Sequence, residues 1–276
     1  MRIQHNIMAM NANRNLTFNN TQMAKNLEKL SSGYRINRAG DDAAGLAISE
    51  SMRADVAIYD QSIKNANDGI AMVQTAEGAL TEVHSMLNRM ETLVTQGASG
   101  TYSEDDREKI GAELEALNKE IERIQDETEF NGIKLFDTKL NANFQVGESS
   151  TAVINLKIQQ DLETKLGANV TGLKGTSVKD STGAACQAAI GHVQTAIKNI
   201  STLRSDLGAI QNRLEHTVNN LGVTMENLQN AESTIRDTNV ADEMMKYTKN
   251  NILIQSAQAM LAQANQIPQG VLQLMQ

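Results

Sequence analysis

Tryptophan is absent from this 276-residue sequence, aromatic residues make up only 3% of it, and proline and cysteine each occur once. The scarcity of aromatic residues and the net charge of −8 disfavour a stacking or electrostatic surface for nucleic acid. The single cysteine, Cys186, excludes an internal disulfide, and we expect it to fill a helix interface. Few prolines and a core supply of Leu, Ile, Val, Ala and Met favour long, uninterrupted helices.

Long apolar runs are also missing. No stretch approaches the roughly 18 apolar residues of a membrane-spanning helix, so we predict no membrane insertion. The first residues do not form a signal peptide, because Arg2, Gln4, His5 and Asn6 interrupt any apolar run. These absences predict either a cytosolic protein or one exported by a route that uses no cleaved signal.

The sequence offers no arrangement of residues that indicates catalysis. The carboxylate pairs Asp41–Asp42 and Asp105–Asp106 fall at expected helix starts, where the helix dipole explains them. The histidines occur singly and without metal-ligand spacing, at His5, His84, His192 and His216. We therefore predict no enzyme activity, no cofactor and no metal site.

Both ends of the chain carry an apolar seam at helical spacing. Near the C-terminus the seam advances by steps of four and three, through Leu253, Ala257, Met260, Ala264, Ile267, Val271 and Leu274. Near the N-terminus apolar residues recur every seven positions, with two more following by four, at Ala9, Leu16, Met23 and Leu30 and at Leu27 and Tyr34. We predict that the two ends pair as a coiled coil, or dock on neighbouring molecules.

Long amphipathic helices are predicted between these ends. One spans residues 43–96, and its apolar line runs at threes and fours from Tyr59 to Val94. After a turn at 97–102, Ser103 and Asp106 have the spacing of a capping box that opens an antiparallel helix. A further helix begins near residue 182 and reaches residue 236.

The helical period changes after Phe130. Asn131–Gly132 is a turn dipeptide, and the residues that follow alternate in places between apolar and polar, as in a small β-hairpin with its turn at 147–150. Residues 159–182 read as a loop. The predicted fold class is therefore mainly α, a long antiparallel helical coiled-coil rod with a small β-hairpin region and with termini paired as a helical coiled coil.

Breaks in the pattern divide the chain into predicted domains. Ser31–Gly33 and the acidic stretch near Asp41 mark one joint, and residues 236–239 mark the other. Residues 1–40 and 237–276 form the terminal coiled-coil domain, and residues 41–158 and 183–236 form the helical rod. Residues 1–40 are basic and residues 101–130 acidic, which fits either solvated faces or charges that align packed copies.

Three sequence runs carry a resemblance to a known family. They are LSSGYRINRAGDDAAGLAIS at 30–49, RSDLGAIQNRLEHTVNNL at 204–221 and LAQANQIPQGVLQLMQ at 261–276. Together with Ile3–Asn6 they resemble the N- and C-terminal signatures of bacterial flagellin, over residues 1–145 and 185–276. The resemblance implies a structural subunit that self-assembles into the extracellular flagellar filament, with the paired termini forming its inner tube. The short segment 159–182 then stands where many flagellins insert variable outer domains, which predicts a thin filament.

The same resemblance implies several partners besides further copies of the chain. They are the flagellar export apparatus, a secretion chaperone that shields the C-terminal helix, a filament cap and the junction protein. The self-assembly residues would be Leu16, Met23, Leu27, Leu30, Leu253, Met260, Ile267, Val271 and Leu274.

A receptor site is also implied. The stretch from Leu87 to Leu93, with Glu113, is similar to the patch by which flagellins engage Toll-like receptor 5, with Arg89, Leu93 and Glu113 as contacts. Glu91–Thr92 departs from the family's basic-then-acidic pair there. The alternative is that Leu93 packs inside the rod and that Arg89 and Glu113 are surface charges.

Two other functions were weighed against the filament subunit. One is the hook–filament junction protein, which shares the terminal helices; the signature runs favour the filament subunit. The other is an enzyme, since some flagellins carry a metalloprotease insert. The sequence has neither the insert nor a His-Glu-x-x-His motif.

Overall fold

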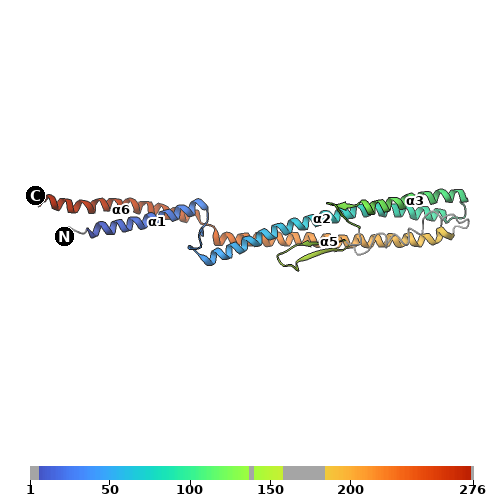
Figure 1. The fold of residues 1–276 in the computed structure, drawn as a ribbon, viewed down its shortest axis with the longest axis horizontal. Helices are drawn as coiled ribbons and strands as arrows, with labels where there is room; N and C mark the ends of the chain where they lie inside the picture. Colours follow the sequence, from blue (N-terminus) through green and yellow to red (C-terminus); the bar gives the residue numbers. More distant parts are fainter. Residues whose placement is uncertain (1–5, 137–139, 158–183, 275–276) are drawn as a thin grey trace. The chain divides into compact units, whose positions relative to one another are not determined.

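The protein is mainly α-helical in the computed structural model, which describes residues 6–136, 140–157 and 184–274 (Figure 1). The elements follow in the order α1 (Ile7–Ser32), α2 (Ala43–Gly97), α3 (Glu104–Glu127), β1 (Glu129–Phe130), β2 (Ile133–Lys134), β3 (Asn141–Gln145), β4 (Val153–Lys157), α5 (Ala184–Arg236) and α6 (Val240–Leu274). This order confirms the predicted fold class of long helices with a small β-hairpin region. The predicted loop at 159–182 lies outside the described residues.

The chain divides into two compact units. The terminal unit comprises Met1–Val56 and Glu226–Gln276, and the central unit comprises Ala57–Met225. Helices α2 and α5 contribute residues to both units.

The terminal unit is built on an antiparallel pair of helices, α1 and α6, which lie side by side (Figure 1). Helix α1 begins where the Asn6 side chain accepts a hydrogen bond from the Ala9 N–H (3.1 Å). It ends at Gly33, whose φ of 76° lies in the left-handed region that favours glycine. The pairing of the two chain ends is therefore confirmed, as is the predicted break at Ser31–Gly33.

Helix α2 covers almost the range predicted for it. The Asp42 carboxylate accepts from the Gly45 N–H (2.9 Å) and so satisfies a free donor of the first turn. With 55 residues, the helix is about 80 Å long at the usual rise. Its end is held by Arg107, which is almost fully buried and donates to the Gly97 and Ser99 carbonyls, both at 3.1 Å.

Helix α3 starts with the predicted capping box. The Ser103 hydroxyl accepts from the Asp106 N–H (3.3 Å), while the Asp106 carboxylate accepts from the Ser103 N–H (3.4 Å) and hydroxyl (2.8 Å). The hydrogen bond from the Ser103 hydroxyl lowers the pKa of Asp106. The α2–α3 turn therefore has fixed geometry at both of its ends.

Three helices of the central unit bury one continuous apolar core. The predicted line of α2 is confirmed, since Val73, Ala76, Leu80, Val83, Leu87, Met90 and Val94 are all fully buried. Facing side chains come from α3 and α5, among them Ile110, Leu114 and Ile121 and Val193, Ile200 and Leu207. Hydrogen bonds link Gln194 to Glu91 and Arg204 to Glu77, so α5 runs antiparallel to α2.

Two short hairpins complete the central unit. Strands β1 and β2 flank Asn131 (φ 50°) and Gly132 (φ 77°), the geometry of a tight two-residue turn. Strands β3 and β4 pair antiparallel with Phe144 opposite Ile154, and residues 147–150 lie in the connection, as predicted. A β-carbon on Gly69 of α2 would lie 3.2 Å from the Phe144 ring, so glycine lets this hairpin pack closely on the helix.

Candidate assembly surface on the paired terminal helices

The contact between α1 and α6 is a heptad-like seam of mostly small or polar residues. In α1 the inward positions step by three and four through Ala9, Ala12, Leu16, Asn19, Met23, Asn26 and Leu30. In α6 they are Glu243, Tyr247, Asn250, Ile254, Ala257, Leu261 and Ala264. Alanine and asparagine are short, so these positions let the two helix backbones approach closely.

A polar cluster sits inside this seam. The Asn26 amide donates to Glu243 Oε1 (2.9 Å) and accepts from Asn250 Nδ2 (3.0 Å) when its nitrogen faces the carboxylate. Glu243 is only 4% exposed and also accepts from Lys246 Nζ (3.0 Å). Such a cluster is satisfied only when α1 and α6 are in one alignment, so it favours a single register.

A second polar contact joins the far ends of the same two helices. Asn6 Nδ2 donates to the carbonyl of Ala264 at 2.8 Å, in addition to the capping bond that its Oδ1 accepts. One side chain therefore starts α1 and also fixes its distance from α6.

The predicted seam is corrected in part. Leu27, Leu253 and Met260 do not face the partner helix, because they are 54%, 39% and 66% exposed. Leu16, Met23 and Leu30 do lie on the inward side and are half-buried. Ile267, Val271 and Leu274 belong to the α6 backbone, but their side chains are outside the described residues.

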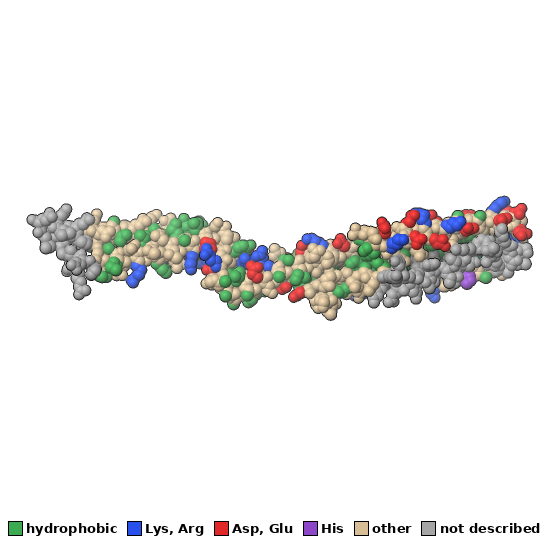
Figure 2. Space-filling view, viewed as in Figure 1, with side chains coloured by type: hydrophobic (Ala, Val, Ile, Leu, Met, Phe, Trp, Pro, Cys, Tyr) green, Lys and Arg blue, Asp and Glu red, His purple; other side chains and the backbone are tan. Residues whose placement is uncertain are grey.

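Large apolar side chains cover the outside of the helix pair. Thirteen of the sixteen exposed large apolar residues in the described part of the chain belong to the terminal unit, so the exposure is concentrated there. Figure 2 shows apolar side chains gathered along the paired helices. On α1 and α6 they are Ile7, Met8, Met10, Phe18 and Leu27, and Val240, Met244, Met245, Ile252, Leu253 and Met260. Solvent-exposed apolar area of this kind indicates an interaction surface.

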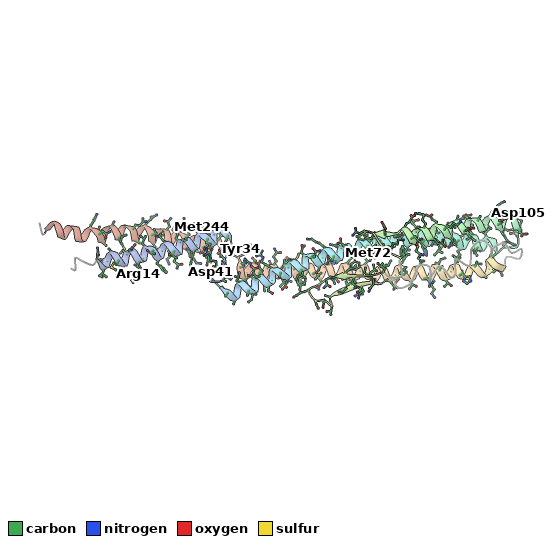
Figure 3. All side chains as sticks on the ribbon, viewed as in Figure 1. Arg14, Tyr34, Asp41, Met72, Asp105 and Met244 are labelled. Atoms are coloured by element: carbon green, nitrogen blue, oxygen red, sulfur yellow. The ribbon has the colours of Figure 1, made fainter. Side chains whose placement is uncertain are left out.

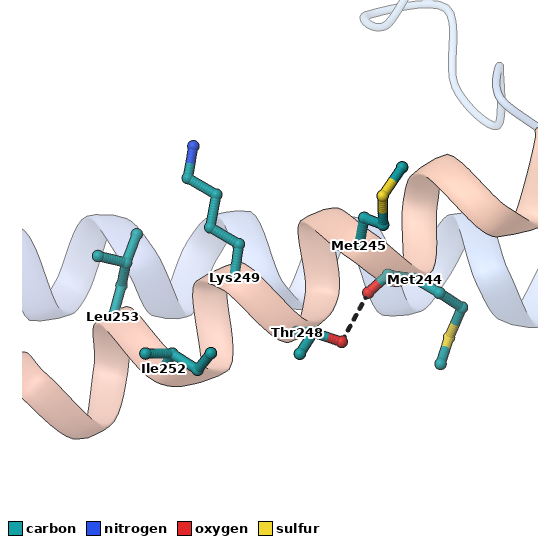
Figure 4. Close-up of a pocket in the computed structure, with 6 residues that line it drawn as sticks. All are labelled: Met244, Met245, Thr248, Lys249, Ile252 and Leu253. Carbon is teal, nitrogen blue, oxygen red and sulfur yellow. Dashed lines mark hydrogen bonds between the residues drawn. The ribbon is translucent and has the colours of Figure 1, made fainter.

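A shallow hollow lies on the outer face of α6. It is lined by Met244, Met245, Thr248, Lys249, Ile252 and Leu253 (Figure 4). The Thr248 hydroxyl donates to the Met244 carbonyl (2.8 Å), so its polar atom is occupied within the helix and its methyl group faces outward with the apolar residues. The hollow therefore offers an apolar contact with one positive charge at its edge.

The joint after α1 is held by the segment that precedes α6. Tyr34, labelled in Figure 3, forms a β-bridge with Asp237, and the Arg35 N–H donates to the Arg236 carbonyl at 2.7 Å. The Arg236 guanidinium lies 4.8 Å from the centre of the Tyr34 ring and pairs with Glu50 at 2.5 Å. These contacts hold the segment that follows α1 against the segment that precedes α6, within the terminal unit.

A loop carboxylate orders the rest of this joint. Asp41 accepts from the backbone N–H groups of Arg38 (3.2 Å) and Asn37 (3.3 Å), and the bond from Arg38 is the main cause of its lowered pKa. Asp41 thus has a local structural role, as predicted for acids at this helix start.

The predicted receptor residues lie in the central unit and differ in exposure. Arg89 on α2 donates through Nε (2.9 Å) and Nη2 (2.7 Å) to one carboxylate oxygen of Glu113 on α3, and both side chains are about half exposed. Leu93 is only 3% exposed and packs in the core. The expected surface contact by Leu93 therefore does not fit its burial, which matches the alternative that it packs inside the rod.

Among the described residues, no group of three or more His, Cys, Asp and Glu side chains could hold a metal ion. Cys186 is buried against Gly97, and burial raises the pKa of its thiol, so it is not a thiolate nucleophile at neutral pH. His5 lies outside the described residues. None of the described helices combines the length and hydrophobicity of a membrane-spanning segment.

Comparison with known proteins identifies this architecture. The family profile for the bacterial flagellin N-terminal helical region matches residues 3–141, and that for the C-terminal helical region matches residues 190–275. The chain is 52% identical to a flagellin of Halalkalibacterium halodurans over 276 residues, covering all of both chains.

Two solved structures share the fold. A crystal structure of Bacillus cereus flagellin aligns with a TM-score of 0.51 and 29% identity, covering 57% of this chain and 88% of that one. A protein described as a flagellar hook-associated protein, from Vibrio parahaemolyticus, aligns with a TM-score of 0.59 over 71% of this chain and 100% of that one. Its identity is only 14%, so it supports the fold alone and does not favour the junction-protein alternative.

Both family profiles match the helical ends of the chain, which places it in a class of structural filament proteins. The chain belongs to the bacterial flagellin family. Because the family is a structural one, the protein is a component of the flagellar filament and not an enzyme.

Proposed function

We propose that the chain self-assembles into a helical homopolymer, the flagellar filament, through the exposed apolar faces of α1 and α6. The observation that carries this proposal is the concentration of exposed large apolar side chains in the terminal unit. A soluble monomer rarely exposes so much apolar surface without a partner. The α1–α6 seam is already filled within one chain, so the outer faces of the pair are the surfaces that remain for neighbouring copies.

The proposed contact joins different surfaces of successive copies. Such a head-to-tail contact does not close on itself and can generate an open helical polymer. The hollow at Met244–Leu253 is one side of this contact, and it excludes water only when a neighbour covers it. Assembly then supports the otherwise thinly packed terminal unit.

The test replaces exposed residues that the fold of the single chain does not need. In the double variant Ile252→Glu and Leu253→Glu, we expect a helical monomer by circular dichroism but no seeded filament growth by electron microscopy. The matched control is Val223→Glu, an exposed apolar position of the central unit, which should still polymerise. Normal filaments from the double variant would refute the proposed surface.

The domain roles extend this proposal. Residues 1–40 and 237–276 form the inner tube of the filament, and residues 41–158 and 183–236 form the surrounding layer. Residues 159–182 stand in place of variable outer domains, so we expect a thin filament by electron microscopy. A diameter equal to that of filaments built from much longer flagellins would contradict this arrangement.

The location of the filament implies the remaining partners. The subunit would leave the cell through the flagellar export apparatus, accompanied by a chaperone on α6, and would be added at the tip beneath the cap, beyond the junction protein. The exposed apolar face of α6 supports the chaperone, because that surface needs covering before assembly. The mature location is extracellular.

We also propose that the unassembled subunit is a ligand of Toll-like receptor 5. The supporting feature is the exposed ion pair of Arg89 and Glu113, which displays charges of both signs on the α2–α3 surface. Leu93 would act from beneath this surface, by packing α2 in the core.

Single charge reversals test the receptor proposal. Arg89→Glu and Glu113→Arg should each weaken receptor binding by about tenfold or more, measured by surface plasmon resonance on monomeric subunit. The double variant Arg89→Glu and Glu113→Arg restores an ion pair, but it should not restore binding if the receptor contacts each charge directly. Lys64→Glu removes another exposed ion pair of α2, with Asp60, and serves as the control. Unchanged receptor binding by both single variants would refute the receptor proposal.

A further inference from the structure

Methionine is distributed unequally between the two units. The buried methionines of the central core are Met72 and Met90, at 4% and 0% exposure. Five others are 48–66% exposed, and all of these belong to the terminal unit: Met8, Met10, Met244, Met245 and Met260. Thioethers on the proposed assembly surface are therefore open to solvent, whereas those of the central core are shielded.

Two of these exposed thioethers, those of Met244 and Met245, lie next to each other. They are consecutive in α6, are 48% and 64% exposed, and both line the hollow of the outer face (Figure 4). Figure 3 labels Met244 on α6 and Met72 on α2, the exposed and the buried case. The other wall residues of the hollow are apolar, apart from Thr248 and Lys249, so a new polar group here would lie on the contact itself.

We propose that Met244 and Met245 form an oxidation site that controls assembly, with a peroxide as the oxidant. This inference rests on the proposed function, because it requires that the hollow is covered by a neighbouring copy. The thioether sulfur attacks one peroxide oxygen, an S–O bond forms as the O–O bond breaks, and water leaves. Sulfur is oxidised by two electrons to the sulfoxide, and the peroxide is reduced by the same two electrons.

The sulfoxide changes what the hollow can bind. Its oxygen is a strong hydrogen-bond acceptor, and a neighbour that covers it with apolar side chains leaves it unsatisfied. The oxidised subunit therefore keeps its fold but loses affinity for the growing end. Once assembled, the same sulfur atoms are covered, so the filament resists an oxidant that disables the free subunit.

The experiment compares matched subunits before assembly. Wild type, M244L/M245L and M8L/M10L are exposed to hydrogen peroxide as monomers, and oxidation is mapped by peptide mass spectrometry. Leucine keeps the apolar character and nearly the volume of methionine. Seeded filament growth is then followed by electron microscopy, and circular dichroism reports on the fold.

The expected results separate the pair from the other exposed methionines. Oxidised wild type and oxidised M8L/M10L should elongate about tenfold more slowly than untreated protein, whereas oxidised M244L/M245L, which keeps its other exposed methionines, should recover most of the untreated rate. Methionine sulfoxide reductase with a dithiol should restore growth. Met72 and Met90 should stay unmodified, which shows that the core has not opened.

Two results would overturn the inference. One is normal growth of wild type carrying sulfoxide at both positions, and the other is growth of oxidised M244L/M245L that is as slow as that of oxidised wild type. Neither affects the proposed function, which fails in a different way: untreated subunits would not elongate on seeds at all.

Discussion

The central and terminal units use apolar residues in opposite ways. In the central unit, large side chains such as Leu80, Leu87 and Met90 are fully inside, and the surface is charged. In the terminal unit, small and polar side chains fill the interior, while methionine, isoleucine and phenylalanine lie outside. The difference supports the proposal that contact with other copies completes the terminal unit, and it predicts that the central unit is stable by itself.

The largest effect expected from this comparison is on the core of the central unit. Leu80→Ala should lower the free energy of unfolding by about 3 kcal/mol, because it removes a fully buried side chain. Ile254→Ala in the α6 seam should lower it by less, since Ile254 is 8% exposed and packs between two helices, whereas Leu80 is enclosed by three. Hydrogen exchange with mass spectrometry reports on each unit separately. Equal losses of unfolding free energy in the two variants would contradict the difference in packing between the two units.

An intermediate effect is expected in the polar cluster of the seam. Glu243→Ala leaves the buried Asn26 amide without the carboxylate to which it donates, although its bond from Asn250 remains, and we expect a loss of about 1–3 kcal/mol in the free energy of unfolding. Faster exchange should be confined to peptides of α1 and α6. Lys246→Ala is the control, because it removes only the exposed partner of Glu243 and should have little effect. A loss in the central unit would argue against separate units.

The smallest effect concerns the start of α3. Ser103→Ala removes the capping box and should cost about 1 kcal/mol, seen as a lower melting temperature in circular dichroism. The pKa of Asp106 is lowered in the folded state, so its contribution is present above the ordinary value of 3.8 and is lost as the pH falls through the folded pKa. The gap between wild type and Asp106→Asn should therefore narrow in acid. A constant gap down to strongly acidic pH would contradict this.

The central unit could be predicted well from sequence for a physical reason. On α2, large apolar residues between Val73 and Val94 occur mostly along one line, so periodicity identifies the buried face. The Ser103–Asp106 box and the Asn131–Gly132 turn depend on local chemistry that the sequence states directly. The burial of Leu93 did not follow from that line. Leu93 lies next to Val94, and its packing in the core makes the buried face of α2 wider than one line of residues.

The terminal unit was harder because apolar residues surround most of α6. Two lines at the same spacing were available, one through Leu253 and Met260 and one through Ile254 and Leu261, and the structure uses the second. The first line is exposed. The inward placement of Asn26, Glu243 and Asn250 was not predicted, because polar residues usually lie on the solvent side, whereas here Asn26 bonds to both of the others. Their heptad spacing was the signal that could have revealed them.

The seam between α1 and α6 makes the stability of the helix pair depend on protein concentration. Alanine and asparagine take half of the inward positions of this seam, so it removes less apolar area from water than a seam of large side chains would, and we expect contact with neighbouring copies to add to the stability of the helix pair. Its thermal transition should therefore shift upward as the protein concentration rises, while that of the central unit stays constant. In a dilute solution the α1–α6 pair should unfold before the central unit, and each neighbouring copy that binds should stabilise the pair.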